Sequence, residues 1–341
     1  MIGRNKIILL ESKPYNMDSE KKFRIAFLGS DEIALPFLLN LERTVPQCEI
    51  SAVLTQPDRP SGRGRKLTPN PIKQWAMDHS IDHRDPISPG MEEITWLESL
   101  RIDLLLVMAY GHILRQPFLE VAKKGCFNLH ASILPYYRGA SPIESALAMG
   151  EKQTGVSLMR IVPKMDAGPL VDMEKVNISS QMNGSDLRRN LSEACLPLLT
   201  RNLPLILSGN HSEVPQDESK ATYCRKLVKA DGFLDFSLTA NELECRIRAF
   251  KAWPGSSFIF QQSRIRVGGA IFSDNVTHLS PGEVGENSSG NLTVGTAKGS
   301  LEMNLLQKPG GRMISAKEFL RGFSIPIGTL LPIEKSVPLI R

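Results

Sequence analysis

Three polar side chains have the types and the spacing needed for acyl transfer to an amine. Asn128 and His130 lie two residues apart at the end of an apolar segment, and Asp166 lies in the turn-forming stretch PKMDAG. A carboxylate can orient an imidazole and favour its charged form, and an asparagine amide can donate a hydrogen bond to a developing oxyanion. No nearby serine or cysteine is placed as a nucleophile, so direct attack by a substrate amine is the simpler reaction. Spacing alone also permits structural roles, because a histidine at a strand end commonly packs and an aspartate commonly forms turns.

Short apolar runs indicate the elements that must position these side chains. The runs lie at 23–30, 50–57, 102–111 and 125–132, and helical patterns separate them. This alternation is typical of an α/β fold with a doubly wound, mostly parallel sheet. Ligands of such sheets bind at the carboxyl ends of the strands, which is where Asn128 and His130 are expected.

A helix is predicted shortly after this strand end. Ser141 has the type of an N-cap, Pro142 occupies the first helical position, and Glu144 lies three residues after the cap. This spacing predicts a capping box. Gly150 is placed to end the helix.

Further elements surround Asp166. Strand patterns at 154–162 and 168–178 flank it, and a helical pattern follows over 185–207. Pro197 and Pro204 lie inside that helical pattern and predict kinks or breaks in it.

Changes in composition divide the chain. We expect residues 1–22 to form a disordered or dispensable extension, because regular patterning begins near 23. An α/β domain follows over 23–207, a polar, turn-rich linker over 208–224, and a second domain over 225–341. Short β-like runs between close turns predict that the second domain is a small β-barrel or β-sandwich.

Composition also limits the class of protein. The 341 residues favour two domains, and the net charge of +5 is only mildly basic. The sequence contains no run of 18 apolar residues, so no membrane span is predicted. The five cysteines are scattered without a C-x-x-C pair, which disfavours zinc and disulfides and favours a reducing cytoplasm. The stretch GSDEIALP lacks the G-x-G-x-x-G pattern, so a dinucleotide site is not expected. No cluster of metal-ligating residues is visible in the sequence, so no metal site is expected either.

The sequence resembles the folate-dependent formyltransferases. The signature FNLHASILPYYRGASPIESALAMGEKQTGVSLM, followed by KMDAG, carries the likeness. The motifs RIAFLGS, LTQPDRPSGRGRKLTPNPIK, VMAYGHIL, IRAFKAWPG and KPGGRMISAKEFL extend it over about residues 23–325. Within this family, the motifs and their order are most similar to the enzymes that formylate methionyl-tRNA.

The resemblance implies a fold and an activity. The fold is a doubly wound formyl-transfer domain followed by an OB-like barrel. The activity is transfer of the formyl group of 10-formyltetrahydrofolate to the α-amino group of methionyl initiator tRNA, giving N-formylmethionyl-tRNA for translation initiation. We expect a cytoplasmic monomer that uses the folate as co-substrate, without a metal and without a membrane partner.

The resemblance also assigns roles to individual residues. The implied catalytic set is Asn128, His130 and Asp166. Folate contacts fall on Ser132, Ile133, Leu134 and Pro135, with a pocket wall made of Met108, Ala109, Tyr110 and Gly111. Ala131, Ile133 and Met165 replace a glycine and two leucines that are common in the family. These departures could reshape the folate pocket, but they remove no catalytic group.

A basic loop over 57–73 is the second informative stretch. It carries five cations, Arg59, Arg63, Arg65, Lys66 and Lys73, against one carboxylate, Asp58. Its glycines allow bending and its prolines exclude a regular helix. A solvated loop is the plain interpretation of such a charge run. Beside a folate site, however, the loop predicts a clamp on an RNA backbone.

Two alternative functions stay open. A formyltransferase acting on a small amine, such as a nucleotide-sugar or a purine precursor, needs neither the basic loop nor the barrel. An inactive RNA-binding or folate-sensing module has no need of an intact set of Asn128, His130 and Asp166. A formyl-transfer assay with charged initiator tRNA and a small amine side by side separates the three.

Overall fold

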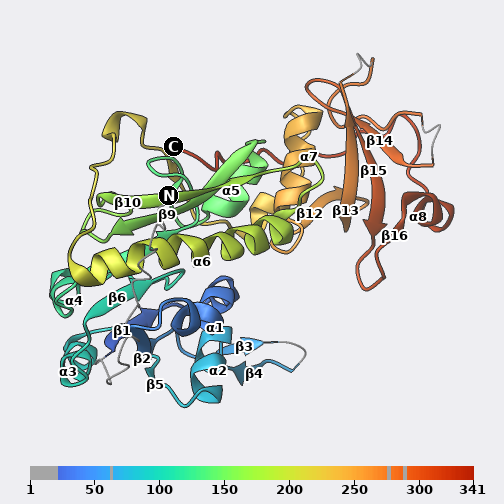
Figure 1. The fold of residues 1–341 in the computed structure, drawn as a ribbon. Coiled ribbons are helices and arrows are strands. Elements are labelled where there is room, and N and C mark those ends of the chain that lie inside the picture. The colour runs from blue at the N-terminus through green and yellow to red at the C-terminus, as the bar shows by residue number, and fades with distance from the viewer. Residues whose placement is uncertain (1–21, 62–63, 275–277, 287–289) are drawn as a thin grey trace, which may run out of the picture.

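The computed structural model describes residues 22–61, 64–274, 278–286 and 290–341 (Figure 1). Residues 1–21, which make up nearly all of the predicted extension, lie outside the described residues. A seven-stranded sheet dominates the first part of the chain, in the order β10-β9-β7-β6-β1-β2-β5. Its strands are β1 (Phe23–Leu28), β2 (Cys48–Leu54), β5 (Asp82–Arg84), β6 (Leu104–Val107), β7 (Cys126–His130), β9 (Gln153–Arg160) and β10 (Leu170–Asn177).

Most of this sheet is parallel. The strands from β7 across to β5 pair in parallel, whereas β9 pairs antiparallel with β7, and β10 antiparallel with β9. The prediction of a mostly parallel sheet is therefore confirmed, with two antiparallel strands added at one edge.

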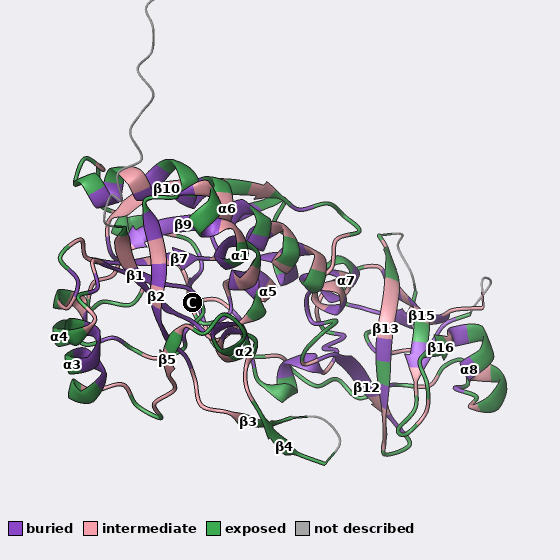
Figure 2. Cartoon of the chain, turned by 60° about the horizontal axis from the view of Figure 1, so that its bottom comes forward, coloured by how far each residue is buried: buried purple, intermediate pink, exposed green. Residues whose placement is uncertain are grey.

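Helices cover both faces of the sheet because successive strand residues point to opposite sides. In β1, Ile25 and Phe27 join one apolar core, and Ala26 and Leu28 join another. The first core also contains residues of α1 (Leu35–Thr44), α2 (Pro71–Asp78), α5 (Pro142–Ala148) and α6 (Gly184–Ser208), and the second contains residues of α3 (Met91–Ser99) and α4 (Gln116–Glu120). The central strands β7, β6, β1 and β2 consequently lie as a largely buried layer between helices (Figure 2).

The structure corrects two sequence-based expectations about helices. Ser141 does begin α5, but its side chain makes no capping bond to the helix. Its Oγ instead accepts a hydrogen bond from the Leu227 N–H at 3.3 Å, and Glu144 pairs with Arg188, so both predicted cap residues serve tertiary contacts. The predicted break in the next helix is wrong as well, since α6 continues through Pro197 and Pro204.

Two small strand pairs lie outside the main sheet. A hairpin joins β3 (Arg59–Ser61) to β4 (Lys66–Thr68) and projects from the body of the molecule (Figures 1 and 2). The second pair joins β8 (Arg138–Gly139) in parallel to β11 (Tyr223–Cys224). Three short 3₁₀ helices, η1 (Glu32–Ala34), η2 (Glu218–Lys220) and η3 (Lys229–Gly232), complete the connections.

The second part of the chain contains antiparallel strands around a separate apolar core. The strand order is β12-β13-β15-β14, and β16 also pairs with β15. The elements are α7 (Ala240–Ala249), β12 (Ser256–Phe260), β13 (Ser263–Ser273), β14 (Leu292–Gly295), β15 (Ser300–Gln307), β16 (Ile314–Ser315) and α8 (Ala316–Gly322). The predicted short strands are present, and they pair antiparallel. Closure of the sheet into an OB-like barrel stays a prediction.

The segment between the two sheets packs on the first of them. Val214 forms a bridge with Leu170 at the start of β10, and Cys224 forms one with Ile340 near the end of the chain. Leu339 is buried in the core that contains α6. The last residues therefore return to the first part of the chain (Figure 1).

Candidate active site

The sheet topology creates a crevice at the carboxyl ends of its central strands. The chain proceeds from β1 to β2 in one direction and returns to β6 on the other side of β1, which is the switch point where open α/β sheets bind ligands. Ser30 follows β1, and its Oγ donates to the Ala109 carbonyl, which follows β6, at 3.1 Å. The ends of β1 and β6 are thus tied together beside β7.

Asn128 and His130 lie at this edge, on β7. Asn128 is half-buried, and its side-chain amide makes no hydrogen bond with the described residues. The amide is therefore available to a ligand. Cys126 begins the same strand, and burial raises the pKa of its thiol to about 12. That thiol is protonated at neutral pH, which agrees with direct attack by an amine rather than by a protein nucleophile.

The imidazole of His130 lies between two hydrogen-bond acceptors. Its Nε2 is 2.9 Å from the Tyr137 carbonyl oxygen, and its Nδ1 is 3.8 Å from Oδ2 of Asp166. A carbonyl can only accept, so Nε2 carries a proton and donates it. Nδ1 is then the ring nitrogen left to exchange a proton with a ligand.

The carboxylate of Asp166 is held in place by a backbone N–H group. Its Oδ2 accepts a hydrogen bond from the Gly139 N–H at 2.8 Å. Its own backbone has a φ of 49°, a left-handed conformation that is uncommon for a residue other than glycine. Asn128, His130 and Asp166 are therefore brought to one edge of the sheet, the last by a turn of unusual backbone geometry.

The predicted folate-contact segment, Ser132 to Pro135, is anchored to β9. Ser157 of that strand donates its Oγ to the Ser132 carbonyl at 2.7 Å and accepts the Leu134 N–H at 3.1 Å. The Ile133 N–H and the Leu134 carbonyl make no hydrogen bond with the described residues. They leave one donor and one acceptor on a segment that a buried serine holds in place.

The predicted pocket wall, Met108 to Gly111, follows β6. Gln56 donates its Nε2 to the Tyr110 carbonyl at 2.9 Å, and a Cβ at Gly111 would lie 2.7 Å from that nitrogen. The hydroxyl of Tyr110 and Nε2 of His112 are buried without a partner among the described residues. Burial raises the pKa of Tyr110 and lowers that of His112, so both are neutral.

The predicted RNA-contact residues divide into two groups. Arg59, Arg65 and Lys66 are exposed on the hairpin, and Arg63 lies outside the described residues. Lys73 is different, because its Nζ pairs with Asp58 at 2.7 Å and with Asp85 at 3.0 Å. The bond to Asp58, assisted by Asp85, raises the pKa of Lys73. Its charge is thus already neutralised at the base of the hairpin.

A buried arginine lies beside the candidate site. Arg138 is fully buried, and its guanidinium donates to Glu218 at 2.8 and 3.2 Å and to the Tyr223 hydroxyl at 2.9 Å. Lys164, on the connection that carries Asp166, pairs with the same glutamate at 2.5 Å. Glu218 therefore joins the segment after β7 to the connection after β9.

Replacing Glu218 with glutamine is expected to weaken the dependence of stability on pH in acid. Arg138, and then Lys164, lower the pKa of Glu218 from 4.5 to about 2. Because folding lowers this pKa, the carboxylate stabilises the fold above 4.5, and that contribution is lost as the pH falls toward 2. Thermal melts across this window should show the wild-type advantage shrinking as the pH falls.

The matched control is Glu193→Gln, which changes an exposed glutamate of α6 without a side-chain partner among the described residues. This control should show no such pH dependence. A difference in melting temperature between Glu218→Gln and wild type that stays constant across the window would contradict the pairing.

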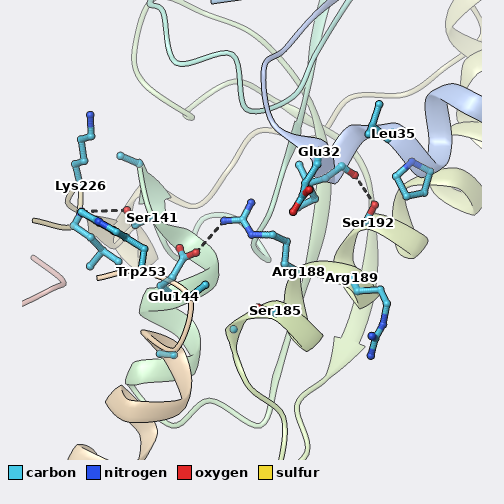
Figure 3. Close-up of a pocket in the computed structure, with 17 residues that line it drawn as sticks. Glu32, Leu35, Ser141, Glu144, Ser185, Arg188, Arg189, Ser192, Lys226 and Trp253 are labelled. Carbon is cyan, nitrogen blue, oxygen red and sulfur yellow. Dashed lines mark hydrogen bonds and ion pairs between the residues drawn. The ribbon is translucent and has the colours of Figure 1, made fainter. Parts of the chain in front are cut away.

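A pocket of about 620 Å³ opens between the two parts of the chain (Figure 3). Arg188 of α6 lies in its wall, and its guanidinium contacts Asp31 at 3.0 Å and Glu144 at 2.9 Å. Lys226 and Trp253 line the same pocket, and Trp253 is 51% exposed. Ala140 lines this pocket, and it directly follows Gly139, whose N–H donates to the carboxylate of Asp166.

These pocket residues could not be found from the sequence pattern. Glu144 carries the pattern of a helix cap, and the ion-pair partners of Arg188 are distant from it in sequence. Trp253 lies inside the motif IRAFKAWPG, which was the one available signal. A second hollow, of about 320 Å³, lies at the base of the hairpin and is lined by Ser30, Gln56 and Arg59 among others.

In the part of the chain that the structure describes, no group of three or more His, Cys, Asp or Glu side chains is arranged to hold a metal ion. Among the described helices, none combines the length and apolar character needed to cross a bilayer.

An asparagine and a histidine–aspartate pair at the carboxyl edge of a doubly wound sheet define a site for group transfer, and comparison with known proteins identifies its class. The chain belongs to the formyl transferase family: the formyl transferase model matches residues 23–202, and the model of the formyl transferase C-terminal domain matches residues 226–324.

Similar relatives are methionyl-tRNA formyltransferases. The one from Methylococcus capsulatus is 39% identical over 304 residues, covering 89% of this chain and 97% of the relative. The one from Halorhodospira halophila is 38% identical over 299 residues, covering 88% and 96%.

Solved structures with the same fold are more distant in sequence. An N-formyltransferase from Helicobacter canadensis, in complex with folinic acid and dTDP-3-aminofucose, has a TM-score of 0.62 and 19% identity, covering 85% of this chain and 100% of that one. HypX from Aquifex aeolicus, in complex with tetrahydrofolic acid, has a TM-score of 0.58 and 17% identity, covering 88% and 47%. At these identities the likeness shows the fold alone.

Proposed function

We propose that this protein transfers the formyl group of 10-formyltetrahydrofolate to the α-amino group of methionyl initiator tRNA, giving N-formylmethionyl-tRNA for translation initiation. One observation carries the proposal: similarity to methionyl-tRNA formyltransferases extends through both parts of the chain, at 39% identity over 304 residues. A small-amine acceptor accounts less well for the exposed basic hairpin.

In this proposal the unpaired amide of Asn128 donates a hydrogen bond to the formyl oxygen, and the substrate amine attacks the formyl carbon. Negative charge then develops on that oxygen, where Asn128 stabilises it. Nδ1 of His130, which lies 3.8 Å from Oδ2 of Asp166, takes the proton that the attacking amine loses, and the resulting imidazolium adds to the stabilisation of the oxygen. Collapse of the tetrahedral intermediate then breaks the bond between the formyl carbon and N10 of the folate, and N10 receives that proton from His130, so that tetrahydrofolate leaves.

The folate contacts in this proposal are the segments that follow β6 and β7. The free N–H of Ile133 and the free carbonyl of Leu134 offer a donor and an acceptor to the pteridine. Ser157 keeps them in place through its two bonds to the same segment. The wall from Met108 to Gly111 closes the other side, at the switch point between β1 and β6.

The acceptor end of the tRNA is assigned to the pocket between the two parts of the chain (Figure 3). This pocket is adjacent to the catalytic edge through Ala140 and Gly139. Three cations line it, of which Arg188 is already paired with Asp31 and Glu144, and Arg189 with Asp186. Lys226 is the lining cation left to contact an RNA end. The amine of the esterified methionine then approaches Asn128 and His130 from this side.

In this proposal the side chains of the basic hairpin contact the sugar–phosphate backbone of the tRNA. Arg59, Arg63, Arg65 and Lys66 are the contacting cations, and Lys73 anchors the base of the hairpin through its two carboxylates. Exposure of Arg59, Arg65 and Lys66 agrees with such a role.

Replacing Arg63 and Arg65 together with alanine is expected to raise the KM for charged initiator tRNA and to leave folate binding unchanged. Each lost phosphate contact should make the slope of log affinity against log salt shallower, by about 0.7–0.9. A contact to a base would instead change discrimination among tRNAs and leave the slope nearly unchanged. Formylation at sub-saturating tRNA and several salt concentrations measures both effects.

The matched control for the hairpin is Lys123→Ala. Lys123 is an exposed cation that precedes β7 and therefore lies at the opposite, amino-terminal edge of the sheet. Its replacement should leave tRNA use unchanged. Wild-type formylation by the double arginine variant would show that the hairpin is a solvated turn.

We further propose a cytoplasmic monomer with two functional domains, residues 23–207 and 225–341, joined by the segment 208–224. All five cysteines are free and buried, which supports a reducing compartment. The two family models match on either side of the joining segment, which supports the division.

A further inference from the structure

The segment that joins the two parts of the chain reaches the candidate site through Gln216. The side-chain nitrogen of Gln216 donates to the backbone carbonyl of Asp166 at 2.9 Å and to that of Gly168 at 2.7 Å. Its side-chain oxygen accepts from Nη2 of Arg138 at 2.8 Å and from Nε at 3.1 Å. Both donors and both acceptor positions of the amide are therefore used.

These partners determine which way the amide faces. A guanidinium can only donate, and a backbone carbonyl can only accept. The oxygen of Gln216 must therefore face Arg138, and the nitrogen must face the carbonyls of Asp166 and Gly168. No other orientation of the amide satisfies all four bonds.

Arg138 is a rigid support for this amide. Its five N–H groups are all engaged: two by Gln216, two by Glu218 and one by the hydroxyl of Tyr223. The side chain is fully buried, and a buried guanidinium with every donor paired cannot move without leaving charge unpaired. Gln216 is consequently held from the side opposite to Asp166.

The turn at Asp166 needs such a support. Its φ of 49° lies in the left-handed region, which non-glycine residues occupy only where surrounding contacts hold them. The two carbonyls that Gln216 binds lie on either side of Ala167, so one amide spans the turn. The carboxylate on this turn contacts the Gly139 N–H at 2.8 Å and lies 3.8 Å from the imidazole of His130.

We propose that Gln216 is a positioning residue for Asp166, and that buried Arg138 holds Gln216 in place. This inference rests on the proposed function, because it deepens the role given there to Asp166. It makes the segment between the two domains a part of the active site, acting through the backbone of the 166–168 turn.

The decisive variant is Gln216→Glu, which keeps the shape of the side chain and its acceptor toward Arg138. The carboxylate has no N–H to offer and places an oxygen against two carbonyls. Displacing a catalytic group by a fraction of an ångström should lower kcat for methionyl initiator tRNA by roughly 10- to 100-fold. The KM values for tRNA and folate should stay near those of the wild type.

A double-mutant cycle tests whether Gln216 acts through Asp166. In an Asp166→Asn background, Gln216→Glu should cause little further loss of kcat, because the positioned carboxylate is already gone. The inference is overturned if kcat of the single variant stays within about twofold of wild type. It is also overturned if Gln216→Glu lowers kcat by the same factor in both backgrounds.

A second readout does not depend on the reaction. The Gly139 N–H, which donates to Asp166, should exchange faster with solvent in Gln216→Glu and keep its wild-type protection in the neighbouring variant Asp217→Asn. Unchanged protection in both would overturn the inference. If the wild type fails to formylate methionyl-tRNA, the proposed function fails, and this exchange measurement still decides the positioning role.

If Gln216→Glu does not fold, Gln216→Asn takes its place. That side chain keeps a neutral amide but is one methylene shorter, so it cannot span from Arg138 to the turn. It is judged by the same kcat, cycle and exchange criteria.

Discussion

Replacing His130 with alanine is expected to lower the rate of formyl transfer by roughly 10²- to 10⁴-fold, the range typical of a lost acid–base group. The imidazole is buried and lies between the Tyr137 carbonyl and the Asp166 carboxylate. In the proposed mechanism this imidazole takes the proton of the attacking amine, which alanine cannot do. Affinity for tRNA should change little, because the cations assigned to the tRNA backbone are exposed on the hairpin whereas His130 is buried.

The same experiment extends to the two partners of His130. Asn128→Ala removes an amide that makes no hydrogen bond with the described residues, so its loss should appear in kcat and not in the melting temperature. Asp166→Asn keeps the shape of the side chain and removes its charge, so activity should also fall severely. Single-turnover rates with charged initiator tRNA measure all three variants. Activity within a few-fold of wild type for His130→Ala or Asp166→Asn would refute the assignment.

Gly139→Ala is expected to cost both stability and activity. Gly139 has a φ of 110°, which is strained for any other residue, and a Cβ there would lie 2.3 Å from the Cys224 carbonyl oxygen. Backbone strain and overpacking each cost roughly 1–3 kcal/mol. Relief of this strain and of the close contact would move β8 away from β11 and would draw the Gly139 N–H away from Asp166.

Two glycine variants separate the causes of this effect. Gly328→Ala tests strain alone, since its φ is 80° but a Cβ would meet nothing within 4 Å. Gly322→Ala should be neutral or stabilising, since it has ordinary φ and open space. Thermal melts should therefore rank Gly139→Ala as the least stable of the three. A melting temperature for Gly139→Ala equal to that of Gly322→Ala would contradict the close approach of β8 and β11.

Strand and helix positions could be predicted because they depend on local patterns. The run that ends at His130 is apolar at the positions that face a core. The strand and the place where it ends could therefore be predicted from the sequence. The failed predictions have a common physical cause. Ser141 and Glu144 carry the pattern of a capping box, but Leu227 and Arg188 compete for the same side chains and win. Such competition between distant residues leaves no local signal.

The long helix α6 shows that distant contacts can also preserve an element that local rules would interrupt. Pro197 and Pro204 each remove a backbone donor, so local rules predict an interruption. Many buried side chains of α6 pack against the sheet, among them Leu191, Leu198 and Leu203. This tertiary packing keeps the helix continuous.

The network around Asp166 could not be predicted from spacing for a similar reason. Arg138 is 78 residues from Gln216, and Gln216 is 50 residues from Asp166. Each of these residues is unremarkable in its own segment. The pairing of β8 with β11 and the bridge between Val214 and Leu170 bring the joining segment against the turn.

The central claim is that the acceptor is methionyl initiator tRNA, and comparison of acceptors tests it most directly. Purified enzyme with 10-formyltetrahydrofolate is given charged initiator tRNA in one reaction, and an amino-sugar nucleotide or a purine-precursor amine in the others. The account predicts a kcat/KM for the charged tRNA that exceeds those for the small amines by orders of magnitude. An equal or higher kcat/KM for a small amine would contradict it, and transfer to no acceptor would indicate an inactive binding module.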